Sequence, residues 1–131
     1  MSSTVLVVED DETIRESVVF CLREEGYTIY DAPDGKAALD LLREHAERMV
    51  VLLDLAMPVV DGFAVVQAVE LDPPLAERHA YIIMSAQERT LPLAFVQQIT
   101  RLNMAVLSKP FDLDQLLETV ASAAARLQTP Q

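Results

Sequence analysis

Cysteine and basic residues are both scarce in this chain. Cys21 is the only cysteine among 131 residues, so no internal disulfide can form, which is consistent with a reducing cytoplasm. Its spacing with Ile14, Val18 and Leu22 predicts a core position on the apolar stripe of a helix rather than a redox role. Ten basic residues stand against 21 acidic ones, which gives a net charge of −11. This balance disfavours binding to nucleic acid or to anionic membranes, because both need a basic footprint.

Long apolar runs and targeting signals are also absent from the sequence. No segment approaches the ~20 consecutive apolar residues that a membrane-spanning helix needs. The opening residues, Met1-Ser2-Ser3-Thr4, have neither the basic region nor the apolar core of a secretion signal. We therefore expect a cytoplasmic protein. His45 and His79 lack metal-ligand spacing and have no third ligand, which disfavours a histidine metal site.

The sequence does contain a regular alternation of strand-like apolar stretches with helix-like amphipathic stretches. With 51% hydrophobic residues, the chain can bury the core of one domain. The alternation occurs five times and predicts an α/β fold, a parallel five-stranded sheet with five helices on its two faces. The expected strands are residues 4–9, 27–31, 49–54, 81–84 and 105–108. The expected helices are residues 11–25, 34–47, 61–71 (ending before Pro73-Pro74), 90–102 and a last helix with an apolar stripe over 113–127.

The order of the strands and the extent of the domain are less directly encoded. Right-handed crossovers limit the order without fixing it. The flavodoxin-like doubly wound order 2-1-3-4-5 is the arrangement we expect, and it makes the first and third strands neighbours. We expect residues 1–127 to form a single domain. Residues 128–131 form a short polar tail, which is either a natural end or the stub of a linker to a further domain.

Charged residues follow three of the expected strands, at the point where each strand ends. The apolar run 49–53 leads into Asp54, the first strand leads into Glu9 and Asp10, and the last strand leads into Lys109. The carboxyl ends of parallel strands form the edge where open α/β sheets bind their ligands. We therefore expect acids and a lysine to meet at one edge of the sheet.

This edge has the composition of a site for a cation and a phosphoryl group. If the first and third strands are neighbours, Asp10 and Asp54 lie side by side and repel unless a proton or a cation lies between them. Mg²⁺ suits such a pair, because it is hard and is usually held by one or two carboxylates, waters and a phosphate. Ser85 and Lys109 add a hydroxyl and an ammonium group. Asp54 at the centre is then a nucleophile that can form an acyl phosphate.

Four short motifs in this order resemble the response-regulator receiver domain of two-component signalling, which has a chemotaxis-regulator-like fold. The resemblance covers essentially all 131 residues. The motifs are Val7-Val8-Glu9-Asp10-Asp11-Glu12, Leu53-Asp54-Leu55-Ala56-Met57-Pro58 with Asp61-Gly62, Ile83-Met84-Ser85-Ala86, and Lys109-Pro110-Phe111.

The resemblance implies a phosphoacceptor rather than an enzyme that acts on external substrates. Asp54 would accept a phosphoryl group from the phosphohistidine of a sensor histidine kinase or phosphotransfer protein, or from a small phosphodonor, and would later lose it by autodephosphorylation. Ser85 and Lys109 would hold the phosphoryl oxygens, and the peptide bond between Lys109 and Pro110 would be cis. An output domain or target protein would bind the face formed by the helix at 90–102, the strand at 105–108 and the last helix.

The resemblance also implies one Mg²⁺ site. Asp10 and Asp54 would bind the ion directly, Glu9 would bind it through water, and the backbone carbonyl of Ala56 would add a ligand. Ala56 and Gln87 occupy the two variable positions that tune the access of water to the acyl phosphate in this family.

Two alternatives from other classes remain open. A phosphatase of the haloacid-dehalogenase type also uses an aspartate after a strand, but it needs a second aspartate two residues later, where this chain has Ala56. A pseudo-receiver would use the same fold as a phosphorylation-independent binding module. Such modules usually lose an acidic residue or the lysine, and all are present here. Only Val106 favours this alternative, because an aromatic switch residue is common at that position in the receiver family.

Overall fold

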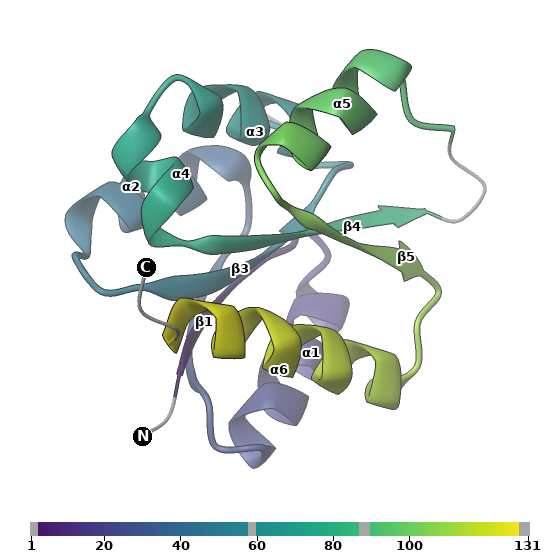
Figure 1. Cartoon of the computed structure of the whole chain (residues 1–131). Coiled ribbons are helices and arrows are strands. Elements are labelled where there is room, and N and C mark those ends of the chain that lie inside the picture. The colour runs from purple at the N-terminus through teal and green to yellow at the C-terminus, as the bar shows by residue number, and fades with distance from the viewer. Residues whose placement is uncertain (1–2, 58–59, 87–89, 129–131) are drawn as a thin grey trace.

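The computed structural model describes residues 3–57, 60–86 and 90–128, and these form a five-stranded parallel sheet covered by helices on both faces (Figure 1). The strand order is β2-β1-β3-β4-β5, which confirms the flavodoxin-like doubly wound fold. The strands are β1 (Thr4–Val8), β2 (Thr28–Ala32), β3 (Met49–Asp54), β4 (Ala80–Ala86) and β5 (Ala105–Lys109). The helices are α1 (Glu12–Glu24), α2 (Gly35–Glu44), α3 (Gly62–Glu70), α4 (Pro73–Arg78), α5 (Leu93–Arg101) and α6 (Leu113–Gln128).

The central strands are apolar on both faces because each face carries its own core. Every residue of β1 and β3 is buried, as expected for strands covered on both sides. Alternate residues of one strand point to opposite faces. Thus Leu6 and Val51 join the core beneath α2, α3 and α5, whereas Val5 and Val50 join the core beneath α1 and α6. Among the described residues, every helix is too short or too polar to cross a bilayer.

Aspartates at the helix N-termini position the helices relative to the strands. The side chains of Asp11, Asp34 and Asp61 each accept a hydrogen bond from a backbone N–H in the first turn of α1, α2 and α3. Asp112 and Gln115 form a reciprocal pair before α6, in which each backbone N–H donates to the other side chain. The capped helices α1, α2 and α6 each begin within a few residues of the end of the preceding strand, at the carboxyl edge of the sheet.

The described residues form six helices, one more than the five expected, which is a small difference within the confirmed fold. The additional helix α4 begins at Pro73, where the sequence had indicated only the end of the preceding helix. Proline suits a first helical turn because its fixed φ is helical and its missing N–H would have no partner there. Leu75 of this helix is 3% exposed, and packing of Leu75 against the core holds the short helix in place.

The outer surface of α1 is more apolar than the sequence suggested. Val18, Val19 and Leu22 are buried beneath it, but Ile14 is 41% exposed and Phe20 is 65% exposed. Cys21 is only partly buried, so the expectation of a core position for it was wrong. Only part of the apolar pattern of α1 therefore faces the sheet, and the rest lies at the surface.

His79 is the most deeply buried histidine and joins the beginnings of two strands. It directly precedes β4, and its Nδ1 accepts a hydrogen bond from the backbone N–H of Met49 at the start of β3, at 3.0 Å. Its Nε2 has no hydrogen-bond partner among the described residues. Burial, reinforced by the positive charges of Arg78 and Arg48, lowers the pKa of His79 to about 4. The imidazole is therefore neutral at pH 7.

We expect His79 to make the fold acid-sensitive. The folded protein keeps the ring neutral down to about pH 4, whereas the unfolded chain binds a proton near pH 6.5, so stability is lost as the pH falls between these values. By pH 4.5 the loss from this residue is about 2.5 kcal/mol. Urea unfolding at pH 7 and pH 4.5 measures it against His79→Asn, whose amide oxygen can still accept from Met49 and does not titrate. Equal acid losses in the two proteins would contradict this assignment.

Candidate functional site

Asp54 ends β3 at the carboxyl edge of the sheet and is 6% exposed. Its Oδ1 accepts a hydrogen bond from the backbone N–H of Ala56 at 3.3 Å. The next residue, Leu55, donates its N–H to the carbonyl of Met84 in β4 at 3.2 Å and accepts from the N–H of Gly62 at 3.1 Å. The backbone on both sides of the carboxylate is therefore fixed by neighbouring elements.

Gly62 allows α3 to begin directly against the end of β3. A Cβ at this position would lie 2.5 Å from the carbonyl oxygen of Asp54 and 2.6 Å from the Cα of Leu55. Only a residue without a side chain fits this close approach. The preceding Asp61 caps the helix, with its Oδ1 accepting from the N–H of Ala64 at 2.9 Å. The Asp61-Gly62 pair thus sets the distance between α3 and Asp54.

Three carboxylates meet beside the end of β3. Carboxylate oxygens of Glu9, Asp10 and Asp54 all lie within 4.8 Å of one another. The parallel pairing of β1 with β3 explains this, because Val8 lies opposite Leu53 and the next residues of both strands emerge at the same edge. Glu9 is 2% exposed, whereas Asp10 is exposed to solvent. The expected juxtaposition of these acids is what the structure shows.

Lys109 supplies the positive charge next to these carboxylates. Its Nζ donates to Oε1 of Glu9 at 2.9 Å and lies 3.5 Å from Oδ1 of Asp54. Burial acts to lower the pKa of Lys109, but the hydrogen bond to Glu9 and the charge of Asp54 outweigh it and hold the pKa above its ordinary value. Lys109 is therefore a stable ammonium group. Its peptide bond to Pro110 is cis, as the family resemblance implied.

Arg15 belongs to the site, although the sequence analysis did not include it. It lies on α1, its Nη1 donates to the carbonyl oxygen of Glu9 at 2.8 Å, and its Nε lies 3.2 Å from Oδ2 of Asp31 at the end of β2. The side chain of Arg15 is only 16% exposed. The signal that could have revealed it is an arginine one turn into a helix that follows the acidic strand end.

Ser85 lies close to Asp54 in the sheet, but among the described residues its hydroxyl makes no hydrogen bond to the acidic group. It is within β4 rather than after it, one residue beyond Met84, which pairs with Asp54. Its hydroxyl donates to the carbonyl oxygen of Ala86 at 3.4 Å. Ala56 is exposed beside Asp54, and Gln87 lies outside the described residues. Glu9, Asp10, Asp54 and Lys109 are therefore brought together, with Ser85 and Ala56 adjacent to them.

The donor set suits a hard divalent cation and an incoming phosphoryl group. Three carboxylates face one ammonium group, so negative charge remains uncompensated at this edge. Oxygen ligands at this spacing are the ligands that Mg²⁺ prefers. The position where a haloacid-dehalogenase-type phosphatase needs its second acid holds the methyl group of Ala56.

The comparison with known families decides the relationship. Residues 5–121 match a family profile whose description is "response regulator receiver domain". The chain belongs to the response regulator receiver family. The receiver also resembles solved structures of this family. The CheY-like receiver domain protein from Methanospirillum hungatei JF-1 has a TM-score of 0.82 and 27% identity, with 96% of this chain and 97% of that chain covered. The receiver domain of the Francisella response regulator 1452 has a TM-score of 0.82 and 27% identity, with coverages of 97% and 100%.

Curated relatives are longer than this receiver. Response regulator GtcR from Aneurinibacillus migulanus is 31% identical over 131 residues, which is 98% of this chain and 49% of that protein. Sensor kinase CckA from Brucella abortus (strain 2308) is 32% identical over 121 residues, which is 91% of this chain and 12% of that protein. The chain therefore spans half or less of the length of these relatives.

Proposed function

We propose that this receiver accepts a phosphoryl group on Asp54 from the phosphohistidine of a histidine kinase or phosphotransfer protein in the cytoplasm. The observation that supports this most directly is the environment of Asp54. Its buried carboxylate ends β3, Lys109 Nζ is 3.5 Å from its Oδ1, and two further acids lie within 4.8 Å. A nucleophile fixed beside a cation and shielded from bulk water is what phosphoryl transfer requires.

The chemistry follows from these groups. A carboxylate oxygen of Asp54 forms a bond to phosphorus while the bond from phosphorus to the donor imidazole nitrogen breaks, and the nitrogen keeps the electron pair. Lys109 stabilises the negative charge that builds up on the phosphoryl oxygens. Ser85 adds a hydroxyl donor once its long bond to Ala86 is exchanged for a phosphoryl oxygen. The product is an acyl phosphate, which water later hydrolyses.

Mg²⁺ is the cofactor that we propose for this site. We assign Asp10 and Asp54 as direct ligands, the carbonyl of Ala56 as a further ligand, and Glu9 as a ligand through water. The hydrogen bonds of Glu9 support its assignment as an indirect ligand. Its Oε1 accepts from Lys109 and its Oε2 accepts from the N–H of Asp11, so both oxygens already have partners. A bound Mg²⁺ would neutralise charge on the attacking carboxylate and on the phosphoryl group.

The proposed output surface is the face of α5, β5 and α6. Leu93 of α5 is 72% exposed and Val106 of β5 is 46% exposed, so apolar groups are available there for a partner. We propose that residues 1–127 act as the receiver domain and that this surface binds an output domain or a separate target protein. A solved two-component response regulator/GGDEF domain protein, of which this chain covers 51%, combines a response regulator with a GGDEF domain in its description.

The test of this function is phosphorylation by acetyl phosphate with Mg²⁺. Intact-mass spectrometry should show one added phosphoryl group on the receiver. A pseudo-receiver would gain none, and a phosphatase of the haloacid-dehalogenase type would turn over an external phosphoester such as p-nitrophenyl phosphate. Absence of the mass gain at saturating donor would reject the phosphoacceptor function in favour of the binding module.

We expect the response to phosphorylation to pass through α5. In many receivers an aromatic ring on the fifth strand turns inward, but Val106 has no ring and a β-branched side chain has little rotamer freedom. Hydrogen exchange on the free and beryllofluoride-activated receiver should therefore change most in residues 85–102, which include α5. Residues 87–89 of this segment lie outside the described residues. A dominant change in α1, or no change, would assign the response to another face.

A further inference from the structure

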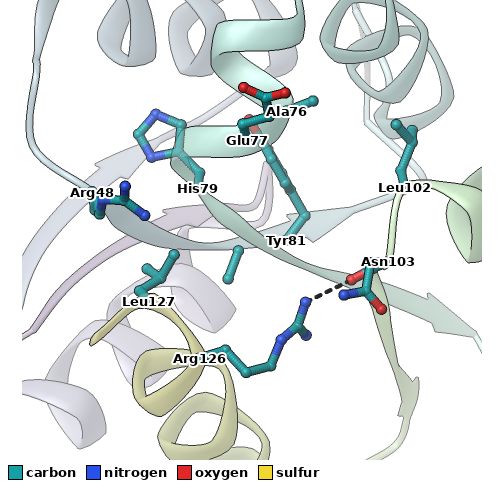
Figure 2. A pocket seen from close by; sticks show the side chains of 10 residues that line it. Arg48, Ala76, Glu77, His79, Tyr81, Leu102, Asn103, Arg126 and Leu127 are labelled. Carbon is teal, nitrogen blue, oxygen red and sulfur yellow. Dashed lines mark hydrogen bonds between the residues drawn. The ribbon is translucent and has the colours of Figure 1, made fainter. Parts of the chain in front are cut away.

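Three arginine side chains of the described residues donate hydrogen bonds, and only that of Arg15 does so at the carboxyl edge of the sheet. Arg126 donates to the carbonyl oxygen of Asn103 at 3.0 Å, at the opposite edge of the sheet (Figure 2). Arg101 pairs with Glu70 between α5 and α3, where the arginine side chain is 62% exposed. The side chain of Arg15 is 16% exposed, so water competes least for its hydrogen bonds.

The carboxylate of Asp10 is held in place by its backbone alone. The Asp54 carboxylate accepts from the N–H of Ala56, and both carboxylate oxygens of Glu9 accept hydrogen bonds. The side chain of Asp10 is exposed and has no hydrogen bond or ion pair in the part of the chain that the structure describes. One of its oxygens nevertheless lies within 4.8 Å of oxygens of Glu9 and Asp54. The backbone around Asp10 therefore decides whether this carboxylate reaches a shared cation.

Arg15 holds that backbone on both sides of Asp10. Its Nη1 donates to the carbonyl oxygen of Glu9 at 2.8 Å, and its own backbone N–H donates to the carbonyl oxygen of Asp11 at 2.8 Å. The carbonyl of Glu9 belongs to the planar peptide group that leads into Asp10, so fixing this carbonyl fixes the direction in which Asp10 leaves the strand. Asp10 thus lies between two carbonyl groups that accept from the same residue.

The end of β2 holds the guanidinium group in this position. The Nε of Arg15 donates to Oδ2 of Asp31 at 3.2 Å. The residue after Asp31, Ala32, accepts the N–H of Glu9 at 3.1 Å. Because the guanidinium is planar and its donors have fixed directions, bonds to Asp31 and to Glu9 together orient it. The end of β2 thus positions both the arginine and the segment that the arginine holds.

We propose that Arg15, anchored by Asp31, is a positioning residue that holds the backbone around Asp10 so that the Asp10 carboxylate is placed to bind Mg²⁺. This inference rests on the metal site of the function proposed above. A residue that orients a metal ligand increases the affinity for the metal. The positive charge of Arg15 acts in the opposite direction, because a cation near the carboxylates repels Mg²⁺. The sign of the change in affinity on removal of the guanidinium therefore separates positioning from charge.

The experiment is a titration of the ¹⁵N-labelled receiver with magnesium chloride in the absence of a phosphodonor, followed at the backbone amides of Leu55 and Ala56. Arg15→Met keeps an apolar stem without donors, and its Kd for Mg²⁺ should be about tenfold higher than that of the wild type. Arg23→Met removes the same charge from the exposed side of α1 and should bind Mg²⁺ as the wild type does. Binding by Arg15→Met that equals or exceeds the wild-type affinity would overturn the proposal, even if its metal-free melting temperature falls.

Two substitutions of Asp31 test the anchor and decide the proposal if Arg15→Met does not fold. Asp31→Asn and Asp31→Ala remove the same charge, but only asparagine keeps an oxygen that can accept from Arg15. The Kd for Mg²⁺ should therefore be higher in Asp31→Ala than in Asp31→Asn, and equal values would overturn the anchoring role.

The wild-type receiver separates this inference from the function on which it rests. A wild type without a saturable response to Mg²⁺ would reject the metal site and the role of Arg15 with it. A saturable response that depends on Arg15, without labelling by acetyl phosphate, would reject the phosphoacceptor function and support the role of Arg15.

Discussion

Asp54→Asn will gain no phosphoryl group from acetyl phosphate and Mg²⁺ under conditions in which the wild-type receiver gains one. The amide has the same shape as the carboxylate, and its oxygen can still accept from the N–H of Ala56, which lies 3.3 Å from Oδ1 of Asp54. It lacks the anionic oxygen that must attack phosphorus. The expected loss of labelling is therefore complete, although the fold is retained. Intact-mass spectrometry at matched donor concentrations measures it.

Asp61→Asn is the matched control for this variant. It makes the same chemical change seven residues away, and asparagine caps a helix about as well as aspartate. Because Asp61 caps α3 through Ala64 and lies outside the acidic group, its labelling should equal that of the wild type. Equal labelling of Asp54→Asn would move the acceptor to another carboxylate. Lost labelling in Asp61→Asn would show that labelling depends on the placement of α3.

Mg²⁺ will raise the melting temperature of the receiver, and Asp10→Ala will abolish this rise. Carboxylate oxygens of Glu9, Asp10 and Asp54 lie within 4.8 Å, so a bound cation relieves a repulsion present in the metal-free fold. At a hundredfold excess over its Kd, a ligand of the folded state stabilises by about 2.7 kcal/mol. Differential scanning calorimetry with and without Mg²⁺ measures the effect.

Without Mg²⁺, Asp10→Ala should melt at or above the wild-type temperature, because Asp10 is exposed and its removal reduces the repulsion. Glu12→Ala is the control, since this nearby acid lies in the first turn of α1 outside the acidic group. It should keep the full response to Mg²⁺. A response that is unchanged in Asp10→Ala would exclude this site as the one that binds the ion.

The sequence predicted the acidic group well because strand ends are well marked. Asp54 and Glu9 each follow an apolar run directly, Asp10 comes next to Glu9, and a parallel sheet brings such strand ends to one edge. Contacts that cross several strands were harder to predict. Lys109 and Glu9 are 100 residues apart and come from strands that are not neighbours, so their 2.9 Å bond depends on the reach of the lysine side chain.

Arg15 and Pro73 show where local patterns were insufficient. Arg15 was not predicted as a site residue, because its partners at the ends of β1 and β2 become close only after the sheet is assembled. Pro73 predicted the end of a helix, but proline is equally suited to begin one, and it begins α4. The burial of His79 could not be predicted from local sequence either, because no local pattern shows which turn residue the core will cover.

The close fit at Gly62 couples the position of α3 to that of β3. No methyl group can be placed between the first residue of this helix and the backbone of Asp54, and the N–H of Gly62 is bonded to the carbonyl of Leu55. Any displacement of the Asp54 backbone must therefore move the start of α3 by a similar amount. If Asp54 is phosphorylated as proposed, a shift of its backbone would therefore be transmitted to α3, on the face of the sheet that also carries α2 and α5.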